Sequence, residues 1–102
     1  MNIREKILVI EDEKTISHFI STILNNNGYE AMQARTGNEA LSMISSHCPD
    51  LVILDLGLPD MDGLDILRQL REWSSLPVVV GNRITANRIT GNGGTYAAFI
   101  DS

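Results

Sequence analysis

The chain has 102 residues, of which 43% are hydrophobic and 21% are charged, a composition typical of one small globular domain. Thirteen acidic residues against eight basic ones give a net charge of −5. We therefore expect no nucleic-acid contact by this domain, because phosphate binding needs clustered Lys and Arg. The one cysteine, Cys48, excludes an internal disulfide and favours a cytoplasmic location. We expect neither a signal peptide nor a membrane span.

The first half of the chain alternates between strand and helix patterns. A buried strand is expected near residues 6–11 and a weaker one at 30–34. Between these strands a helix is expected, with Asp12 as candidate N-cap and Gly28 as its end. Its apolar residues recur at helical spacing: Ile16, Phe19, Ile20, Ile23 and Leu24. Thr36-Gly37-Asn38-Glu39 is a capping box that opens a second helix.

The clearest strand pattern covers residues 50–55 and ends in Asp55. A third helix follows the loop 56–62, with Leu64, Leu67 and Leu70 on one side and Trp73 packed at its end. A fourth strand covers 77–80. Strands separated by helices predict an α/β fold with a parallel sheet and helices on both faces.

The composition changes after Val80. No Leu or Val follows it, and Gly, Asn and Thr are frequent among residues 81–102. We therefore divide the chain into residues 1–80 and a tail, 81–102, so that the fold is incomplete or rebuilt after the fourth strand. The tail offers a substitute fifth strand at 96–100, and the connection 81–95 is long enough for a crossover.

Two predicted strands end in acidic residues at the same edge of the sheet, which is where parallel sheets bind ligands. Glu11 and Asp12 follow the first strand, and Asp55 ends the third. Three converging carboxylates repel one another and favour a cation, and hard oxygen ligands suit Mg²⁺. One carboxylate can then act as a nucleophile toward a phosphoryl group. The alternative is that these acids only cap helices, which for Asp12 alone is the better interpretation.

The stretches Ile7–Glu13, Asp50–Gly63 and Leu67–Val80 resemble the receiver domain of two-component response regulators. The resemblance covers residues 1–80 and is greatest to potassium-responsive (Kdp-type) transcription factors with a winged-helix output domain. It implies a flavodoxin-like fold with strand order 2-1-3-4-5. It also implies transcription regulation, with a sensor histidine kinase as partner and an aspartyl phosphate that makes the domain a phosphoacceptor rather than an enzyme.

The resemblance assigns roles by position. Asp55 is the phosphoacceptor, Asp12 is a direct Mg²⁺ ligand, and Glu11 assists through water. The backbone carbonyl of Gly57 is a further Mg²⁺ ligand. Pro59 and Gly63 shape the loop and the start of the third helix.

The chain departs from the family after the fourth strand. The family places Ser or Thr at the end of that strand, where this chain has Gly81 and Asn82. The family's later lysine is absent, because the two lysines are Lys6 and Lys14. The helices that form the family's dimer face are not recognisable. We therefore predict impaired phosphorylation at Asp55.

Two other functions remain open at this point. One is a truncated or chimeric α/β module that does not signal and self-associates, as a homodimer or by exchanging its tail, because its sheet edge is exposed. The other is an aspartyl-nucleophile phosphatase. Gly57 disfavours it, since such enzymes use a second aspartate there.

Overall fold

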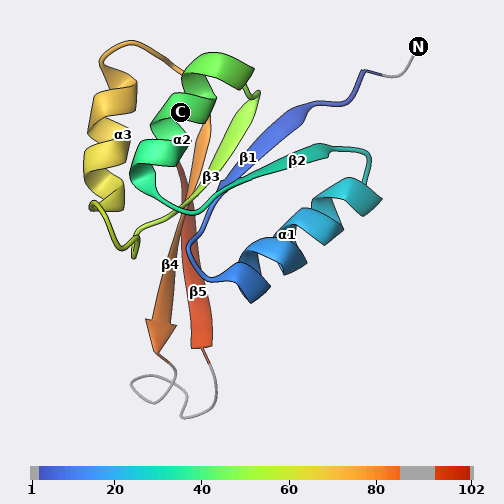
Figure 1. The fold of residues 1–102 in the computed structure, drawn as a ribbon. Coiled ribbons are helices and arrows are strands. Elements are labelled where there is room, and N and C mark those ends of the chain that lie inside the picture. Colours follow the sequence, from blue (N-terminus) through green and yellow to red (C-terminus); the bar gives the residue numbers. More distant parts are fainter. Residues whose placement is uncertain (1–2, 86–93, 102) are drawn as a thin grey trace.

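The computed structural model describes residues 3–85 and 94–101, with side chains described for residues 3–81. Within these residues five strands and three helices form one sheet with helical layers (Figure 1). In chain order they are β1 (Lys6–Ile10), α1 (Lys14–Asn26), β2 (Glu30–Ala34), α2 (Gly37–His47), β3 (Leu51–Asp55), α3 (Gly63–Arg71), β4 (Val78–Thr85) and β5 (Gly94–Asp101).

The strand order in the sheet is β2-β1-β3-β4-β5. The first four strands are parallel, and β1 lies between β2 and β3. This arrangement confirms the expected flavodoxin-like α/β fold and its strand order.

The last strand corrects one expectation. Residues 81–95 do not form a crossover connection to a parallel strand, because β4 continues through Gly81 to Thr85 and β5 runs antiparallel to it. The ladder extends from the pair Val78 and Asp101 to the pair Thr85 and Gly94. The β-branched residues around Ile84 that make this segment a poor helix favour a longer strand instead. The sequence Asn-Arg-Ile-Thr occurs at 82–85 and again at 87–90, and the second copy lies outside the described residues.

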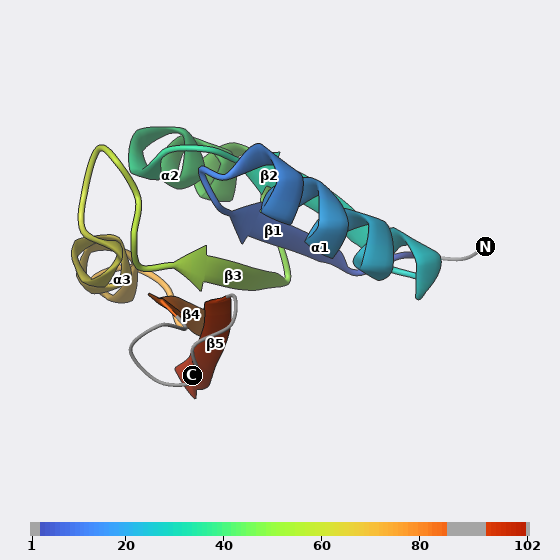
Figure 2. The ribbon, with the colours of Figure 1, turned by 90° about the horizontal axis from the view of Figure 1, so that it is seen from below.

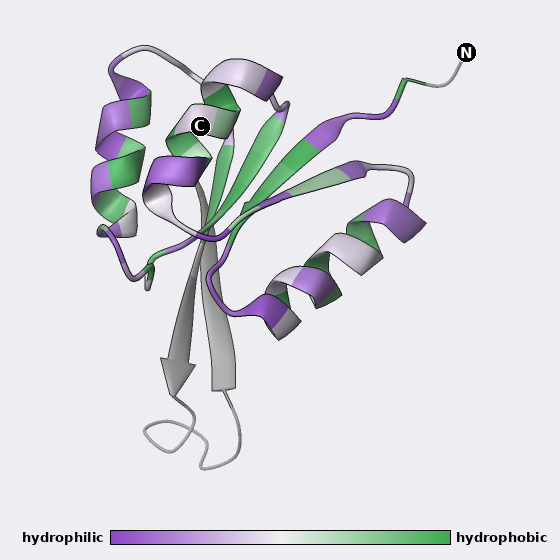
Figure 3. Ribbon diagram, viewed as in Figure 1, coloured by the Kyte–Doolittle hydropathy of each residue, from purple (hydrophilic) through white to green (hydrophobic). Residues whose placement is uncertain are grey.

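The main core lies between one face of the sheet and the pair α2 and α3. Figure 3 shows hydrophobic colour along the central strands and on the side of α3 that faces α2 and the sheet. Alternate strand residues supply the sheet side, and two residues from each helix cover them: Leu8, Ile10, Val52, Leu54, Val78, Val80, Ala40, Ile44, Ile66 and Leu70. Within α3, Ile66 and Leu70 are buried and Leu64 is 41% exposed. The expected packing of Trp73 is wrong, since this side chain is 56% exposed.

The opposite face of the sheet is covered by α1, which lies along β2 and β1 (Figures 1 and 2). Its buried residues are Ser17 and Ser21, and the Ser17 hydroxyl donates to Oε1 of Gln33 at 3.1 Å. The apolar residues at helical spacing along α1 are partly open to solvent, with Phe19 65% and Ile23 46% exposed. These residues are open because α1 packs on β2 and β1, and among the described residues no helix covers this side of β3 and β4 beside it.

The ends of α1 and α2 lie where the capping residues predict, except that the N-cap of α1 is the next residue along the chain. Thr36 caps α2 by accepting from the amide of Glu39 at 3.1 Å, as the capping box predicts. The N-cap of α1 is Glu13 rather than Asp12, which leaves Asp12 in the turn before the helix. Gly28 follows the end of α1 with φ of +87°, a conformation that favours glycine. Among the described residues no helix is long and apolar enough to cross a bilayer.

Candidate functional site

Two neighbouring strands bring acidic residues to the same edge of the sheet. Ile10 pairs with Leu54, so the residues that follow these two positions, Glu11 and Asp55, extend side by side from β1 and β3. The amide of Glu11 donates to the carbonyl of Ala34 at 3.0 Å, which continues the ladder with β2 beyond the end of β1. Backbone pairing therefore fixes the Glu11 main chain, and with it the start of the loop that carries Asp12.

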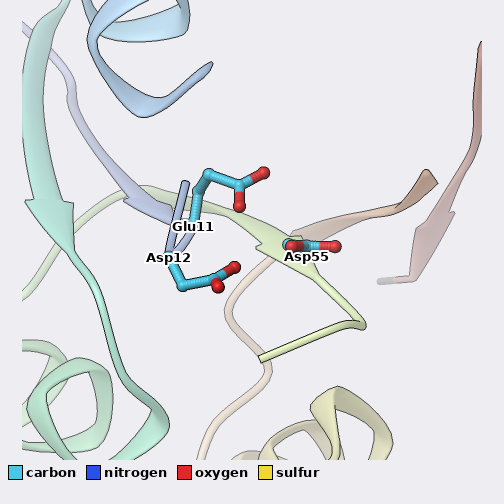
Figure 4. Close-up of side chains that lie close together, drawn as sticks. All are labelled: Glu11, Asp12 and Asp55. Carbon is cyan, nitrogen blue, oxygen red and sulfur yellow. The ribbon is translucent and has the colours of Figure 1, made fainter. Parts of the chain in front are cut away.

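The carboxylates of Glu11, Asp12 and Asp55 form one cluster (Figure 4). One oxygen from each side chain lies within 4.8 Å of the oxygens of the other two. Glu11 is buried, whereas Asp12 and Asp55 are partly exposed. The three candidate residues that the sequence placed at this edge are thus brought together, with one group inside the fold and two facing solvent.

Burial raises the pKa of Glu11 from 4.5 to about 7. A hydrogen bond from the amide of Glu13 to Oε2 of Glu11, at 3.0 Å, acts in the opposite direction. The neighbouring carboxylates of Asp55 and Asp12 supply a smaller part of this rise to about 7. The cluster therefore disfavours the fully ionised state in the absence of a counter-ion, which is the electrostatic property of a cation site.

The loop after β3 holds the side chain of Asp55. The amide of Gly57 donates to Oδ1 of Asp55 at 3.1 Å, which orients this carboxylate. At the far end of the loop Gly63 lies against Leu56, so that a Cβ at Gly63 would be 2.8 Å from the Leu56 Cα. The role of the Gly57 carbonyl as a metal ligand stays a prediction, as does the metal role of Glu11, Asp12 and Asp55.

The donor set fits Mg²⁺ in its chemistry. It consists of carboxylate oxygens, which are the hard ligands that this ion prefers, and two of the three groups face solvent, where water can complete the coordination. Glu11, Asp12 and Asp55 would hold the ion.

On the other side of Asp55 lies Gly81 of β4. The two residues are paired in the ladder, and the amide of Leu56 donates to the Gly81 carbonyl at 3.1 Å. A glycine offers no hydroxyl at this position. At this position β4 therefore contributes its backbone, not a polar side chain, to the surroundings of Asp55.

Sequence reasoning missed a cleft beside the cluster. Arg35, Thr36, Glu39 and Pro59 line this cleft of about 420 Å³ together with Asp12. Asp60, which follows Pro59, accepts hydrogen bonds from the first amides of α2. The contact joins residues more than twenty positions apart, and no local pattern predicts such a pairing.

Comparison with known proteins identifies the family. The family described as "Response regulator receiver domain" matches residues 7–90, which extends past the expected limit at residue 80. The KDP operon transcriptional regulatory protein KdpE of Escherichia coli is 45% identical over 74 residues, which cover 72% of this chain and 33% of KdpE. KdpE of Mycobacterium tuberculosis is 49% identical over the same length. The chain thus spans about a third of these relatives.

Solved structures agree with this result. The receiver domain of the Francisella response regulator 1452 has a TM-score of 0.75 at 34% identity, over 86% of this chain and 75% of that one. The response regulator TrrA of Thermotoga maritima, solved in complex with Mg²⁺ and BeF, has a TM-score of 0.65 at 38% identity, over 67% of this chain and 59% of that one. With a family match over most of its length and this fold, the chain belongs to the response regulator receiver domains.

Proposed function

We propose that this chain accepts a phosphoryl group on Asp55, from a sensor histidine kinase, with the help of Mg²⁺. The observation that supports this proposal is the meeting of Glu11, Asp12 and Asp55 at the sheet edge, with carboxylate oxygens within 4.8 Å of one another. The metal would be held by these three residues and by the Gly57 carbonyl. When bound, it would neutralise charge on the phosphoryl oxygens.

The chain's own residues prepare Asp55 for this reaction. The Gly57 amide holds Oδ1, and Asp55 is partly exposed at the sheet edge, where a donor can approach it. In the transfer a carboxylate oxygen forms a bond to phosphorus. The bond from phosphorus to the histidine nitrogen of the kinase breaks, and the electron pair stays on that nitrogen.

We also propose that phosphorylation is impaired. Gly81 pairs with Asp55 and provides no hydroxyl to contact a phosphoryl oxygen. Lys6 is the first residue of β1, at the end of the sheet opposite Asp55, and Lys14 is the first residue of α1. Without a hydroxyl beside Asp55, the charge that develops on the phosphoryl group has one partner fewer, which weakens both the transfer and the response of the fold to it.

Treatment with acetyl phosphate and Mg²⁺, followed by intact-mass spectrometry and peptide mapping, tests the proposal. We expect a small, labile phosphoryl adduct confined to Asp55 and absent from Asp55→Asn. Asp50→Asn is the matched control, because it removes the same charge at the other end of β3, where Asp50 accepts from the Lys6 amide. An adduct that survives in Asp55→Asn contradicts the phosphoacceptor role, and an abundant, long-lived one contradicts the impairment.

The biological setting is part of the proposal. The relatives named as transcriptional regulators are about three times as long as the matched region. We propose that this chain serves as the cytoplasmic input domain of such a regulator, with the receiver function in residues 1–80 and a tail in 81–102 that extends the sheet. DNA contact would then belong to another part of the regulator.

One observation favours a second function, self-association. On the α1 side, the uncovered face of β3 and β4 forms a groove of about 340 Å³ with an apolar lining, which includes Phe19, Ile20, Ile53 and Val79. Within the described residues β5 pairs with β4 alone, so its outer edge is available to another strand. Two copies that join along this face would cover both features.

Light scattering after gel filtration tests the second function. We expect a dimer that Phe19→Ser weakens at least tenfold, because exposed aromatic residues often dominate interfaces. Trp73→Ser is the control, since Trp73 is a similarly exposed aromatic residue beyond the end of α3. A monomer at high concentration, or an equal effect of the two substitutions, contradicts self-association through this groove.

A further inference from the structure

The loop between β3 and α3, Leu56–Asp62, is anchored by three aspartates. At its start, Asp55 accepts from the amide of Gly57 at 3.1 Å. At its end, Asp62 accepts from the amide of Leu64 at 3.0 Å and so caps α3. These two contacts are local. The third aspartate, Asp60, instead joins the loop to a different part of the fold.

Asp60 binds the first turn of α2 with both carboxylate oxygens. Oδ1 accepts from the amide of Gly37 at 2.7 Å, and Oδ2 accepts from the amide of Asn38 at 3.1 Å. The first amides of a helix have no carbonyl partner inside the helix. Thr36 satisfies the next amide, that of Glu39, so the start of α2 is completed by Asp60 and its own cap. The hydrogen bond from the Gly37 amide is the main reason why the pKa of Asp60 is lower than usual.

Close packing accompanies these hydrogen bonds. A Cβ at Gly37 would overlap the side chain of Met61 and would lie 2.9 Å from Cδ1 of Ile66. The loop therefore lies directly against the first turn of α2, at a distance that glycine allows. Hydrogen bonds and packing together fix how far the loop stands from α2.

This anchor lies beside the acidic cluster. Pro59 from the loop and Thr36 from the start of α2 line the same cleft as Asp12. The loop that carries Pro59 and Asp60 also carries Gly57, whose amide orients Asp55. The distance between α2 and the loop therefore affects how Asp55, held by Gly57, is placed relative to Asp12 across the cleft.

From this arrangement we infer that Asp60 is a positioning residue for the acidic site. By joining the loop between β3 and α3 to the start of α2, Asp60 holds Asp55 and Gly57 in place relative to Asp12. Cation affinity at the site then depends on a carboxylate that does not touch the cation. The inference rests on the proposed Mg²⁺ site and names a residue that this site requires.

An amide NMR titration with Mg²⁺ tests the inference. In the unaltered chain we expect the amides of Gly57 and Gly37 to shift with one common affinity. In Asp60→Ala we expect binding about tenfold weaker, the lower end of the effect of groups that orient metal ligands, with no shift at Gly37. Asp60→Asn removes the same charge but keeps one acceptor oxygen, so we expect it to restore part of the affinity. If Asp60→Ala folds poorly, the Mg²⁺ affinity of Asp60→Asn alone is compared with that of the unaltered chain.

The remaining outcomes separate the two proposals. Asp65→Ala is the control: this acid lies on α3, pairs with Arg68 and is exposed, so we expect an affinity within about twofold of the unaltered chain. Equal weakening in Asp60→Ala and Asp60→Asn would mean a charge effect and would overturn the inference. A Gly57 shift with unchanged affinity in Asp60→Ala would overturn the inference alone. No Gly57 shift in the unaltered chain would overturn the proposed Mg²⁺ site as well.

Discussion

The protonation of Glu11 should control cation binding near neutral pH. Burial raises the pKa of this carboxyl to about 7, and a metal ligand must lose its proton before it binds. With one proton to displace, the apparent dissociation constant is multiplied by 1 + 10^(7−pH). This factor is about 1.1 at pH 8 and about 11 at pH 6. We therefore expect Mg²⁺ to bind about tenfold more weakly at pH 6 than at pH 8.

Isothermal titration calorimetry at the two pH values measures this ratio, with Glu11→Gln as the informative variant. Gln keeps the size and an acceptor oxygen but does not titrate in this range. In Glu11→Gln we expect weaker binding at pH 8 and nearly equal binding at pH 6 and pH 8. An equal affinity of the unaltered chain at both pH values would refute the reasoning, since it would mean that Glu11 is ionised throughout or takes no part, direct or through water, in holding the cation.

The same shift has a consequence for stability without metal. The folded state of this chain holds the Glu11 proton more tightly than the unfolded state does, so the contribution of Glu11 to stability is fully present below pH 4.5 and is lost as the pH rises through about 7. Between pH 5 and pH 8 we expect Glu11 to contribute a loss of about 1 kcal/mol, roughly half of what the full shift would give, because the partly exposed neighbours of Glu11 admit water to the cluster. Urea unfolding at pH 5 and pH 8 measures the loss, which Glu11→Gln should abolish.

Three further predictions concern the loop and α2. Gly63→Ala should cost about 1–3 kcal/mol in urea unfolding, because its Cβ meets the Leu56 backbone, whereas Gly57→Ala should change stability by less than about 0.5 kcal/mol, since its Cβ has nothing closer than 3.8 Å. Equal effects would refute the packing argument. The lowered pKa of Asp60 stabilises the fold above pH 3.8 and this contribution is lost at lower pH, so Asp60→Asn should lose less stability on acidification. Thr36→Ala should cost about 1 kcal/mol by circular dichroism melts, and no change would exclude its capping role.

Local sequence patterns were sufficient for most of the elements. Alternating apolar runs and capping residues predicted β1 to β4 and the three helices, because strand and helix periods depend on neighbours along the chain. They also predicted that Glu11, Asp12 and Asp55 meet, because parallel strands bring their carboxyl ends to one edge. The family resemblance, which rests on the same residues, was confirmed by the match over residues 7–90.

Other features depend on contacts that no local pattern encodes. Either direction of β5 would occupy the same edge of β4, so the length of the connection and the free edge did not distinguish a crossover from the antiparallel pairing found. The exposure of Phe19 depends on where α1 packs across the sheet, since helical spacing shows which residues share a face but not what opposes that face.

The sequence by itself determined the order of the elements, the acidic residues at the strand ends and the family. The tertiary structure decided how deeply Glu11 is buried, and therefore its raised pKa. It also decided that Asp60 completes the start of α2. The physical reason is that strand and helix periods act between near neighbours, whereas desolvation and long-range hydrogen bonds depend on groups that meet when the whole sheet is assembled.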